Sequence, residues 1–146
     1  MSITIRKGSI LDADCDVIVH QVNCRGCMGK GLAKSIRAKY PEVYTEYMKL
    51  ACRLGSLALG HVQTVEVAPG KYVANMFGQD SFGYVGLHTD YEAVEQALTT
   101  MNKIYKGLTV GFPMYIGCGL GGGDWNIIYS LIEKCTPDLE VYLYKI

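Results

Sequence analysis

The sequence lacks an excess of charge of either sign. Its 146 residues include 14 lysines and arginines and 14 aspartates and glutamates, so the formal net charge is zero. Sequence-independent binding to a nucleic-acid backbone needs a basic face, which a chain without net positive charge supplies poorly. We therefore expect no nucleic acid among the partners of this protein.

A long apolar run is also missing. No stretch reaches the roughly 18 apolar residues of a membrane-spanning helix, and residues 1–7 contain no apolar core of a secretion signal. We therefore expect a soluble cytoplasmic protein without a membrane partner. Apolar residues make up 49% of the chain, and no repeat or linker interrupts it, so we expect residues 1–146 to form a single domain around one core.

The six cysteines lack the spacing of a disulfide framework or a zinc site. Only Cys24 and Cys27 have Cys-x-x-Cys spacing, and the second pair that a structural zinc site requires is absent. The acidic residues 12–16 also fail as a calcium loop, because Val17 and Asn23 stand where glycine and glutamate are needed. We expect neither a metal nor a cofactor.

Glycine, by contrast, is concentrated in two stretches. Residues 112–124 read Phe-Pro-Met-Tyr-Ile-Gly-Cys-Gly-Leu-Gly-Gly-Gly-Asp, and residues 23–31 read Asn-Cys-Arg-Gly-Cys-Met-Gly-Lys-Gly. Each stretch lies between an apolar run and an amphipathic one. A glycine loop between a strand and a helix lets backbone N–H groups approach a phosphate, and the positive end of the following helix adds to the attraction. We interpret both stretches as ligand loops; a mobile loop without a ligand is the alternative for residues 112–124.

Apolar runs of strand length alternate with amphipathic runs of helix length. Helices are expected after residue 31, from Pro41, after Thr89 and from Trp125, and strands at residues 2–6, 17–22, 61–67, 71–77, 108–112 and 139–144. This alternation predicts an α/β fold with helices on both faces of a mixed, mostly parallel sheet. Residues 68–70, Ala-Pro-Gly, predict a hairpin, and Thr89-Asp-Tyr-Glu has the spacing of a capping box with Thr89 as the N-cap.

Two common readings of the second glycine stretch fail. Residues 117–122 match Gly-x-Gly-x-x-Gly, but a dinucleotide-binding fold needs several further strand–helix units, and only one strand follows. A phosphocysteine enzyme would need an arginine after Cys118 in a Cys-x5-Arg loop, and none is present. We interpret Cys118 as a small packing residue of the loop and not as a nucleophile.

Four stretches together resemble a macro domain, and the similarity runs over essentially the whole chain. They are Asn23 and residues 28–33, 75–79 and 116–125. The resemblance is to the small single-domain branch that includes ADP-ribose-1″-phosphate phosphatases and terminal ADP-ribose hydrolases. It implies a three-layer α/β/α fold with a cleft for ADP-ribose or an ADP-ribosylated protein. It also implies hydrolysis of ADP-ribose-1″-phosphate or a related 1″-linked derivative; the alternative is a non-catalytic ADP-ribose reader module.

The resemblance assigns ligand contacts as well. Asn23 matches the asparagine that hydrogen-bonds the distal ribose, and the loop beside that ribose matches Gly29, Lys30 and Gly31. The loop that holds the diphosphate matches Gly117, Cys118, Gly119, Leu120 and Gly121. Apart from the resemblance, the aromatic residues Tyr115 and Phe82 are candidates to stack on a sugar or base, with packing in the core or at the rim as the alternative. Ser9, followed by Ile10, stands where many macro domains have an aspartate that contacts the adenine amino group.

The candidate catalytic residues are Asn23 and Asp124. Asn23 would orient the ribose, and Asp124 is the carboxylate nearest to the second glycine loop, although an aspartate before a helix also serves as a plain N-cap. The lysine nucleophile and the aspartate of the terminal hydrolases fall on Gln79 and Gly121, which cannot perform that chemistry. His20 lies in an apolar strand, and we interpret it as a core histidine bonded to the backbone, with a role as a base as the alternative.

Overall fold

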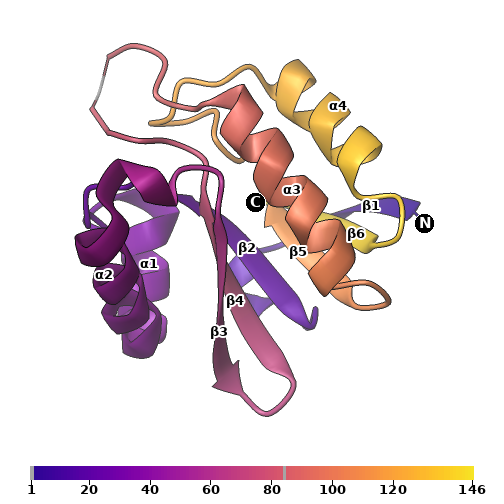
Figure 1. Ribbon diagram of the computed structural model, residues 1–146. Helices are drawn as coiled ribbons and strands as arrows, with labels where there is room; N and C mark the ends of the chain where they lie inside the picture. The colour runs from indigo at the N-terminus through magenta and orange to yellow at the C-terminus, as the bar shows by residue number, and fades with distance from the viewer. Residues whose placement is uncertain (1, 84) are drawn as a thin grey trace.

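The computed structural model describes residues 2–83 and 85–146, in which six strands form one sheet (Figure 1). The strand order is β1-β6-β5-β2-β4-β3. The strands are β1 (Ser2–Lys7), β2 (Val17–Val22), β3 (Val62–Ala68), β4 (Lys71–Phe77), β5 (Thr109–Pro113) and β6 (Glu140–Lys145). β3 is antiparallel to β4, as the expected hairpin requires, and the other pairs are parallel. The prediction of a mixed, mostly parallel sheet is confirmed.

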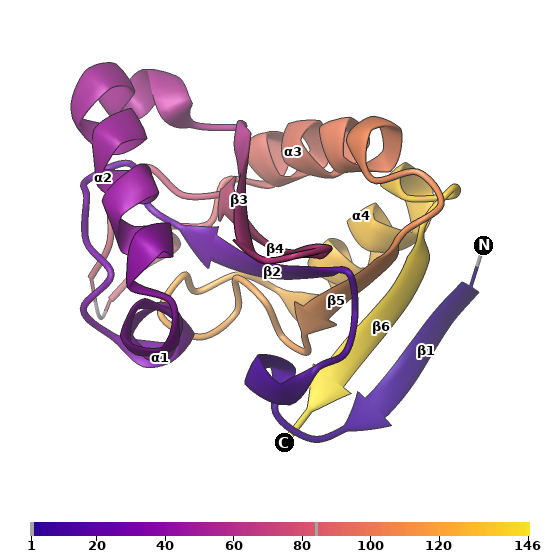
Figure 2. The same cartoon turned by 90° about the horizontal axis from the view of Figure 1, so that it is seen from below.

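Helices cover both faces of this sheet (Figure 2). α1 (Gly31–Lys39) and α2 (Pro41–Leu54) pack on one face, and α3 (Tyr91–Ile104) and α4 (Trp125–Cys135) pack on the other. Short 3-10 turns occur at Ile10–Asp12 and Gly55–Ala58. The expected three-layer α/β/α arrangement is therefore confirmed. Within the two described ranges, no helix is both long and apolar enough to cross a membrane.

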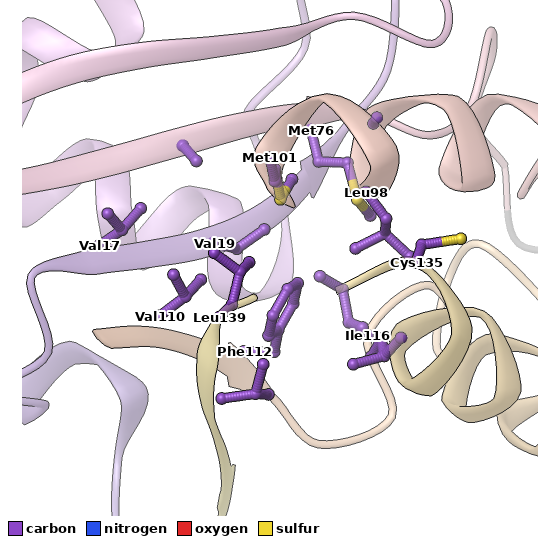
Figure 3. Close-up of a cluster of buried hydrophobic side chains, with 14 of the residues drawn as sticks. Val17, Val19, Met76, Leu98, Met101, Val110, Phe112, Ile116, Cys135 and Leu139 are labelled. Atoms are coloured by element: carbon purple, nitrogen blue, oxygen red, sulfur yellow. The ribbon is translucent and has the colours of Figure 1, made fainter. Parts of the chain in front are cut away.

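One core lies between the sheet and the pair α3 and α4 (Figure 3). Alternate residues of β2, Val17 and Val19, face this core beside Phe112 of β5, and Leu98 and Met101 of α3 pack onto them. All five side chains are buried. Each contributes about 1.5–3 kcal/mol by leaving water, which holds the two helices against the central strands.

A second core fills the opposite face. It joins Val73 and Phe77 of β4 to Ile36 of α1 and to Val43 and Tyr47 of α2. The rings of Tyr47 and Phe77 stack with their centroids 5.7 Å apart. Tyr47 is fully buried, and its hydroxyl group reaches the loop that precedes α1, where it donates to the carbonyl oxygen of Asn23.

The start of α3 differs from the expected capping box. Asp90, and not Thr89, is the N-cap, and its carboxylate accepts a hydrogen bond from the backbone N–H of Ala93 at 3.0 Å. Thr89 is buried one residue earlier, where its hydroxyl donates to the carbonyl oxygen of Gly117 at 2.7 Å. The hydroxyl is therefore used to join α3 to the second glycine loop.

The carboxyl ends of three neighbouring parallel strands, β5, β2 and β4, lie at one edge of the sheet. The loops at residues 114–124, 23–30 and 78–90 leave the strands there. In open α/β sheets this edge is where ligands bind. Both glycine loops therefore reach the same place from strands that are far apart in the sequence.

Candidate functional site

A cavity of about 650 Å³ opens at this edge of the sheet. Its walls come from β2, the first glycine loop, the start of α1, the loop after β4 and the second glycine loop. The lining residues are His20, Gln21, Val22, Asn23, Cys27, Gly29, Lys30, Gly31, Leu32, Ala33, Gln79, Phe82, Gly83, Pro113, Met114, Tyr115, Ile116, Gly117, Gly119, Leu120 and Gly121. The volume is that of a typical small-molecule site.

Asn23 organises the first glycine loop. Its side-chain oxygen accepts hydrogen bonds from the backbone N–H of Arg25 at 2.9 Å and from the Tyr47 hydroxyl at 2.8 Å. Its side-chain nitrogen donates to the carbonyl oxygen of Cys27 at 3.0 Å. Burial raises the pKa of Tyr47 well above its usual value, so this hydroxyl keeps its proton. Asn23 and Tyr47 thus hold the loop that carries the glycines.

The start of α1 borders the cavity without a side-chain cap. Gly31 is its first residue, and Lys30, the N-cap, makes no capping hydrogen bond with its side chain. Gly31, Leu32 and Ala33, whose N–H groups form the first turn, all line the cavity. An uncapped helix start of this kind attracts an anion through its N–H groups and the helix dipole.

The second glycine loop offers further N–H groups. In the described part of the chain, the backbone N–H groups of Gly119, Leu120 and Gly121 make no hydrogen bond, although all three residues line the cavity. The loop turns through left-handed backbone at Tyr115, with φ 67°, and at Gly117, with φ 77°. Successive free N–H groups in a tight turn form an anion-binding concavity.

A network of side-chain hydrogen bonds holds the second glycine loop in place. Gln21 of β2 donates through Nε2 to Gln79 Oε1 at 2.8 Å and to the Thr89 hydroxyl at 2.9 Å, and Thr89 in turn bonds Gly117. The carbonyl oxygen of Gly121 accepts from the backbone N–H groups of His88 and Thr89 at 2.8 and 2.9 Å. This network, which we call the Gln21 network, fixes the direction in which the free N–H groups of the loop point.

The Gln21 network also explains why glycine stands at three positions. A Cβ atom at Gly78 or Gly117 would lie 2.4 or 2.9 Å from Gln21 Oε1, and one at Gly121 would lie 2.4 Å from Thr89 Oγ1. These separations are shorter than any ordinary non-bonded contact with a carbon atom. At these positions the backbone lies so close to the network that a Cβ atom fits only if Gln21 or Thr89 moves.

His20 is buried in the cavity lining, with 1% of its surface exposed. Its Nε2 lies 2.5 Å from the side-chain Oδ1 of Asn75, so the expected bond to the backbone is wrong. The strand register, which pairs His20 with Asn75 across β2 and β4, brings the two side chains together. Burial lowers the pKa of His20 to about 4, which leaves the ring neutral near pH 7.

Four residues expected at the site are placed outside this lining. Asp124 is exposed, and its carboxylate caps α4 by accepting from the N–H of Asn126 at 2.8 Å. Ser9 caps the turn at Ile10–Asp12, and Ile10 is buried in a separate apolar cluster. The Cys118 thiol donates to the carbonyl oxygen of Ile116 at 3.4 Å, and burial raises its pKa, which opposes the thiolate form.

The capped start of α4 changes the expected source of positive potential. The sequence suggested that the helix after the second glycine loop would attract phosphate. The Asp124 carboxylate instead occupies its first turn, and α4 contributes no residue to the lining of the cavity. The uncapped helix start at the cavity belongs to α1 and follows the first loop.

Aromatic side chains form the mouth of the cavity. Phe82 and Tyr115 line it and are about half exposed, at 52% and 48%. The Tyr115 ring packs edge-on against Trp125 with the centroids 5.4 Å apart, which supports it from the side of α4. Both rings are available to pack against a flat or apolar part of a ligand.

Carboxylates are missing from the lining that the structure describes. Its side chains with polar atoms are amides, a neutral histidine, a thiol, a tyrosine and Lys30, which makes an interaction of its own. Across residues 2–83 and 85–146, no group of three or more His, Cys, Asp and Glu side chains is arranged to hold a metal ion. The arrangement favours binding of an anion by backbone N–H groups.

The lining residues that sequence reasoning did not single out include Gln21, Pro113 and Met114, although the last two lie in the stretch 112–124 that was interpreted as a ligand loop. A signal existed for Gln21, because an uncharged polar residue interrupts the apolar run of β2. Pro113 is the last residue of β5 and Met114 follows it, and neither carries a polar group that would mark it. Their place in the lining depends on the end point of the strand.

Comparison with known proteins places this architecture in a family. An ADP-ribose 1″-phosphate phosphatase from Saccharomyces cerevisiae is 33% identical over 99% of both chains. A DNA ADP-ribosyl glycohydrolase from Mycobacterium tuberculosis is 26% identical over 97% of this chain, which spans only 42% of that relative's length.

Comparison with solved structures gives the same result as comparison with these relatives. The macrodomain of Mycobacterium tuberculosis DarG superposes with a TM-score of 0.82 at 26% identity, over 99% of this chain and 98% of that one. A protein of unknown function from Bacteroides thetaiotaomicron superposes with a TM-score of 0.89 at 29% identity, over 100% and 99% of the two chains. The model of the Macro domain family matches residues 19–132, from β2 to α4. This chain belongs to the macro domain family.

Proposed function

We propose that the protein binds ADP-ribose in this cavity and hydrolyses a bond at the 1″ position of the distal ribose, with ADP-ribose-1″-phosphate as the substrate. The observation that carries the proposal is the convergence of two anion-binding elements on one cavity. These are the free N–H groups of Gly119, Leu120 and Gly121 and the uncapped start of α1. Phosphatase and glycohydrolase relatives support the choice of ligand.

The parts of ADP-ribose match different walls of the cavity. The diphosphate suits the second glycine loop and the start of α1, where N–H groups replace the water around its charged oxygens. The distal ribose suits the first loop, at Asn23 and Gly29 to Gly31, as the family resemblance implies. Phe82 and Tyr115 at the mouth offer apolar contact to the adenine or to a group attached at the 1″ position.

The chemistry that suits this lining is attack by water on a substrate held in place. Gln79 is hydrogen-bonded through both ends of its amide, to Gln21 and to the carbonyl oxygen of Ser81, so it supplies no nucleophile. Hydrolysis adds one water across the bond and releases ADP-ribose and inorganic phosphate. The N–H groups of the second loop hold the diphosphate and Asn23 orients the ribose, so that the bond at the 1″ position is fixed for attack by water.

Phosphate release from ADP-ribose-1″-phosphate tests this function. The wild-type protein is expected to release phosphate, and a Gly119→Glu variant, which places a carboxylate among the free N–H groups, is expected to lose most of the activity. A Cβ atom at this position meets nothing within 4 Å, so we expect the variant to fold. Release that does not exceed the Gly119→Glu level would exclude hydrolysis of this substrate.

A reader module without turnover is the second candidate. It is favoured by the absence of Asp and Glu side chains from the described lining. Calorimetry with ADP-ribose, followed by hours of incubation with ADP-ribose-1″-phosphate, separates the two functions. Binding without any product identifies a reader, and a lack of binding rejects both. Proteins and DNA that carry ADP-ribose are further ligands to compare, since the glycohydrolase relatives are named for DNA.

A further inference from the structure

His20 carries a buried acceptor that no residue of the described ranges uses. The histidine lines the cavity from β2, and its Nε2 is held by Asn75. Its other ring nitrogen, Nδ1, is buried and has no hydrogen-bond partner in the described part of the chain. A buried polar atom without a partner destabilises the fold, so such an atom in a binding cavity points to a ligand.

A chain of hydrogen bonds determines which nitrogen of His20 carries the proton. Gln63 of β3 donates through Nε2 to the backbone carbonyl oxygen of Glu46 at 2.9 Å, and that oxygen can only accept. Gln63 therefore presents its Oε1 to Asn75, whose Nδ2 donates to it at 3.0 Å. Asn75 in turn presents Oδ1 to His20, so Nε2 of the neutral ring donates and Nδ1 keeps a free lone pair.

We propose that His20 is a specificity-determining residue, whose Nδ1 accepts a hydrogen bond from an N–H or O–H group of the bound nucleotide. The inference rests on the proposed binding of ADP-ribose. A lone pair repels phosphate oxygens, which are acceptors themselves, so His20 contacts the nucleoside parts of the ligand. The donors there are the adenine amino group and the ribose hydroxyl groups. His20 is a positioning group for these donors, since it stays neutral at the pH of the cytoplasm.

Two substitutions of His20 separate the acceptor from its structural bond. In His20→Gln, the amide reaches the position of Nε2 and keeps the bond to Asn75, but the acceptor at Nδ1 is lost. In His20→Asn, the shorter amide places an oxygen near the position of Nδ1 and loses Asn75. We expect His20→Gln to be the more stable protein and to bind ADP-ribose roughly 2- to 12-fold more weakly than wild type, and His20→Asn to bind within 2-fold of wild type.

Ligand analogues identify the donor. Inosine diphosphate ribose lacks the adenine amino group, and ADP lacks the distal ribose with its hydroxyl groups. Wild type should lose affinity for whichever analogue lacks the donor, and His20→Gln should show a loss that is smaller by the same roughly 2- to 12-fold factor. Equal losses in wild type and His20→Gln for both analogues, and for analogues that lack a hydroxyl group of the proximal ribose, would overturn the proposal.

Nitrogen-15 NMR of the histidine ring tests the proposal on the wild-type protein alone. We expect Nε2 to be protonated in the free protein and the Nδ1 signal to move when ADP-ribose saturates the cavity. Protonation on Nδ1, or an Nδ1 signal that ADP-ribose leaves in place, would overturn the proposal. Failure of the proposed function is distinguishable, because wild type would then show no binding of ADP-ribose by calorimetry.

Discussion

Replacing Gly121 with alanine tests whether the Gln21 network sets the shape of the second glycine loop. The added Cβ atom would lie 2.4 Å from Thr89 Oγ1 and 2.7 Å from the carbonyl oxygen of Gly117. Those two atoms form a hydrogen bond of 2.7 Å, which must break or lengthen to make room. Forced overpacking costs about 1–3 kcal/mol and the lost bond about 1 kcal/mol, so we expect Gly121→Ala to lose about 2–4 kcal/mol of unfolding free energy.

Gly119→Ala is the matched control. Gly119 is two residues away in the same loop, its φ lies outside the left-handed region, and a Cβ atom there meets nothing within 4 Å. The substitution restricts the unfolded chain without straining the folded one, so the unfolding free energy should be unchanged or rise by up to about 1 kcal/mol. The two variants differ by the same methyl group in one loop, and only one of them meets the network.

Urea denaturation of the three proteins at one pH measures both effects, and calorimetry with ADP-ribose measures the consequence for the loop. Gly121→Ala should bind more weakly even where it is fully folded, because the shift of its backbone redirects the free N–H groups of Gly119 and Leu120. Equal midpoints for Gly119→Ala and Gly121→Ala would refute the argument that contact with Thr89 fixes this loop. A lower urea midpoint of Gly121→Ala with an unchanged affinity for ADP-ribose would refute the link between the Gln21 network and binding.

Three further outcomes are expected. Tyr47→Phe removes the hydroxyl that bonds Asn23 and should cost about 1–3 kcal/mol in urea and weaken ADP-ribose binding in calorimetry, whereas unchanged stability would contradict the role of this bond. Asp124→Ala should cost about 1 kcal/mol and Asp124→Asn only a few tenths, because asparagine caps a helix as well; a loss of phosphatase activity in a stable Asp124→Asn protein would instead assign the carboxylate to catalysis. His20 has a pKa of about 4 when folded and an ordinary value of 6.5 when unfolded, so the unfolded chain binds more protons between these values. Unfolding free energy should therefore fall as the pH drops from 6.5 to 4, by up to about 3 kcal/mol, and urea midpoints of His20→Gln should depend less on pH in that window.

The strands, the helices and the order of the layers were predictable because local patterns decide them. The apolar run of β2 predicts an interior strand, and the Ala-Pro-Gly turn predicts the hairpin of β3 and β4. The two glycine loops were also visible, and the structure places both at one cavity. The strand order, in which β5 lies beside β2, was not predictable, because the rule for parallel crossovers fixes their handedness and not which strands are neighbours.

Hydrogen bonds between residues far apart in the sequence could not be predicted, because local patterns offered equally good partners. Thr89 has the spacing of a capping residue, yet its hydroxyl bonds Gly117, and the adjacent Asp90 serves as the cap with the same chemistry. The apolar strand predicts a backbone partner for His20, whereas the parallel register of β2 and β4 places the Asn75 amide beside its ring. Neither choice can be made before the register of the sheet is known.

The electrostatics of the two helix starts escaped prediction for a related reason. An aspartate before α4 and a lysine before α1 are visible in the sequence, but which start reaches the cavity depends on the exit path of each loop. Asp124 therefore stays a prediction as a catalytic residue, as do Ser9 and Ile10 as adenine contacts. None of the three is among the residues that line the cavity.

The position of β1 at the edge of the sheet affects how the chain folds during synthesis. β1 pairs with β6, so Ser2 can pair only after Glu140, its partner in the register, has been synthesised. β2, β4 and β5, which hold the cavity, leave the ribosome earlier. A nascent chain that stops short of β6 therefore has the walls of the ligand site, but it leaves an unpaired edge on β5 and a loose first strand. Such a chain is open to exchange of strands between molecules, and the long separation of the β1 and β6 partners predicts that the edge of the sheet closes last.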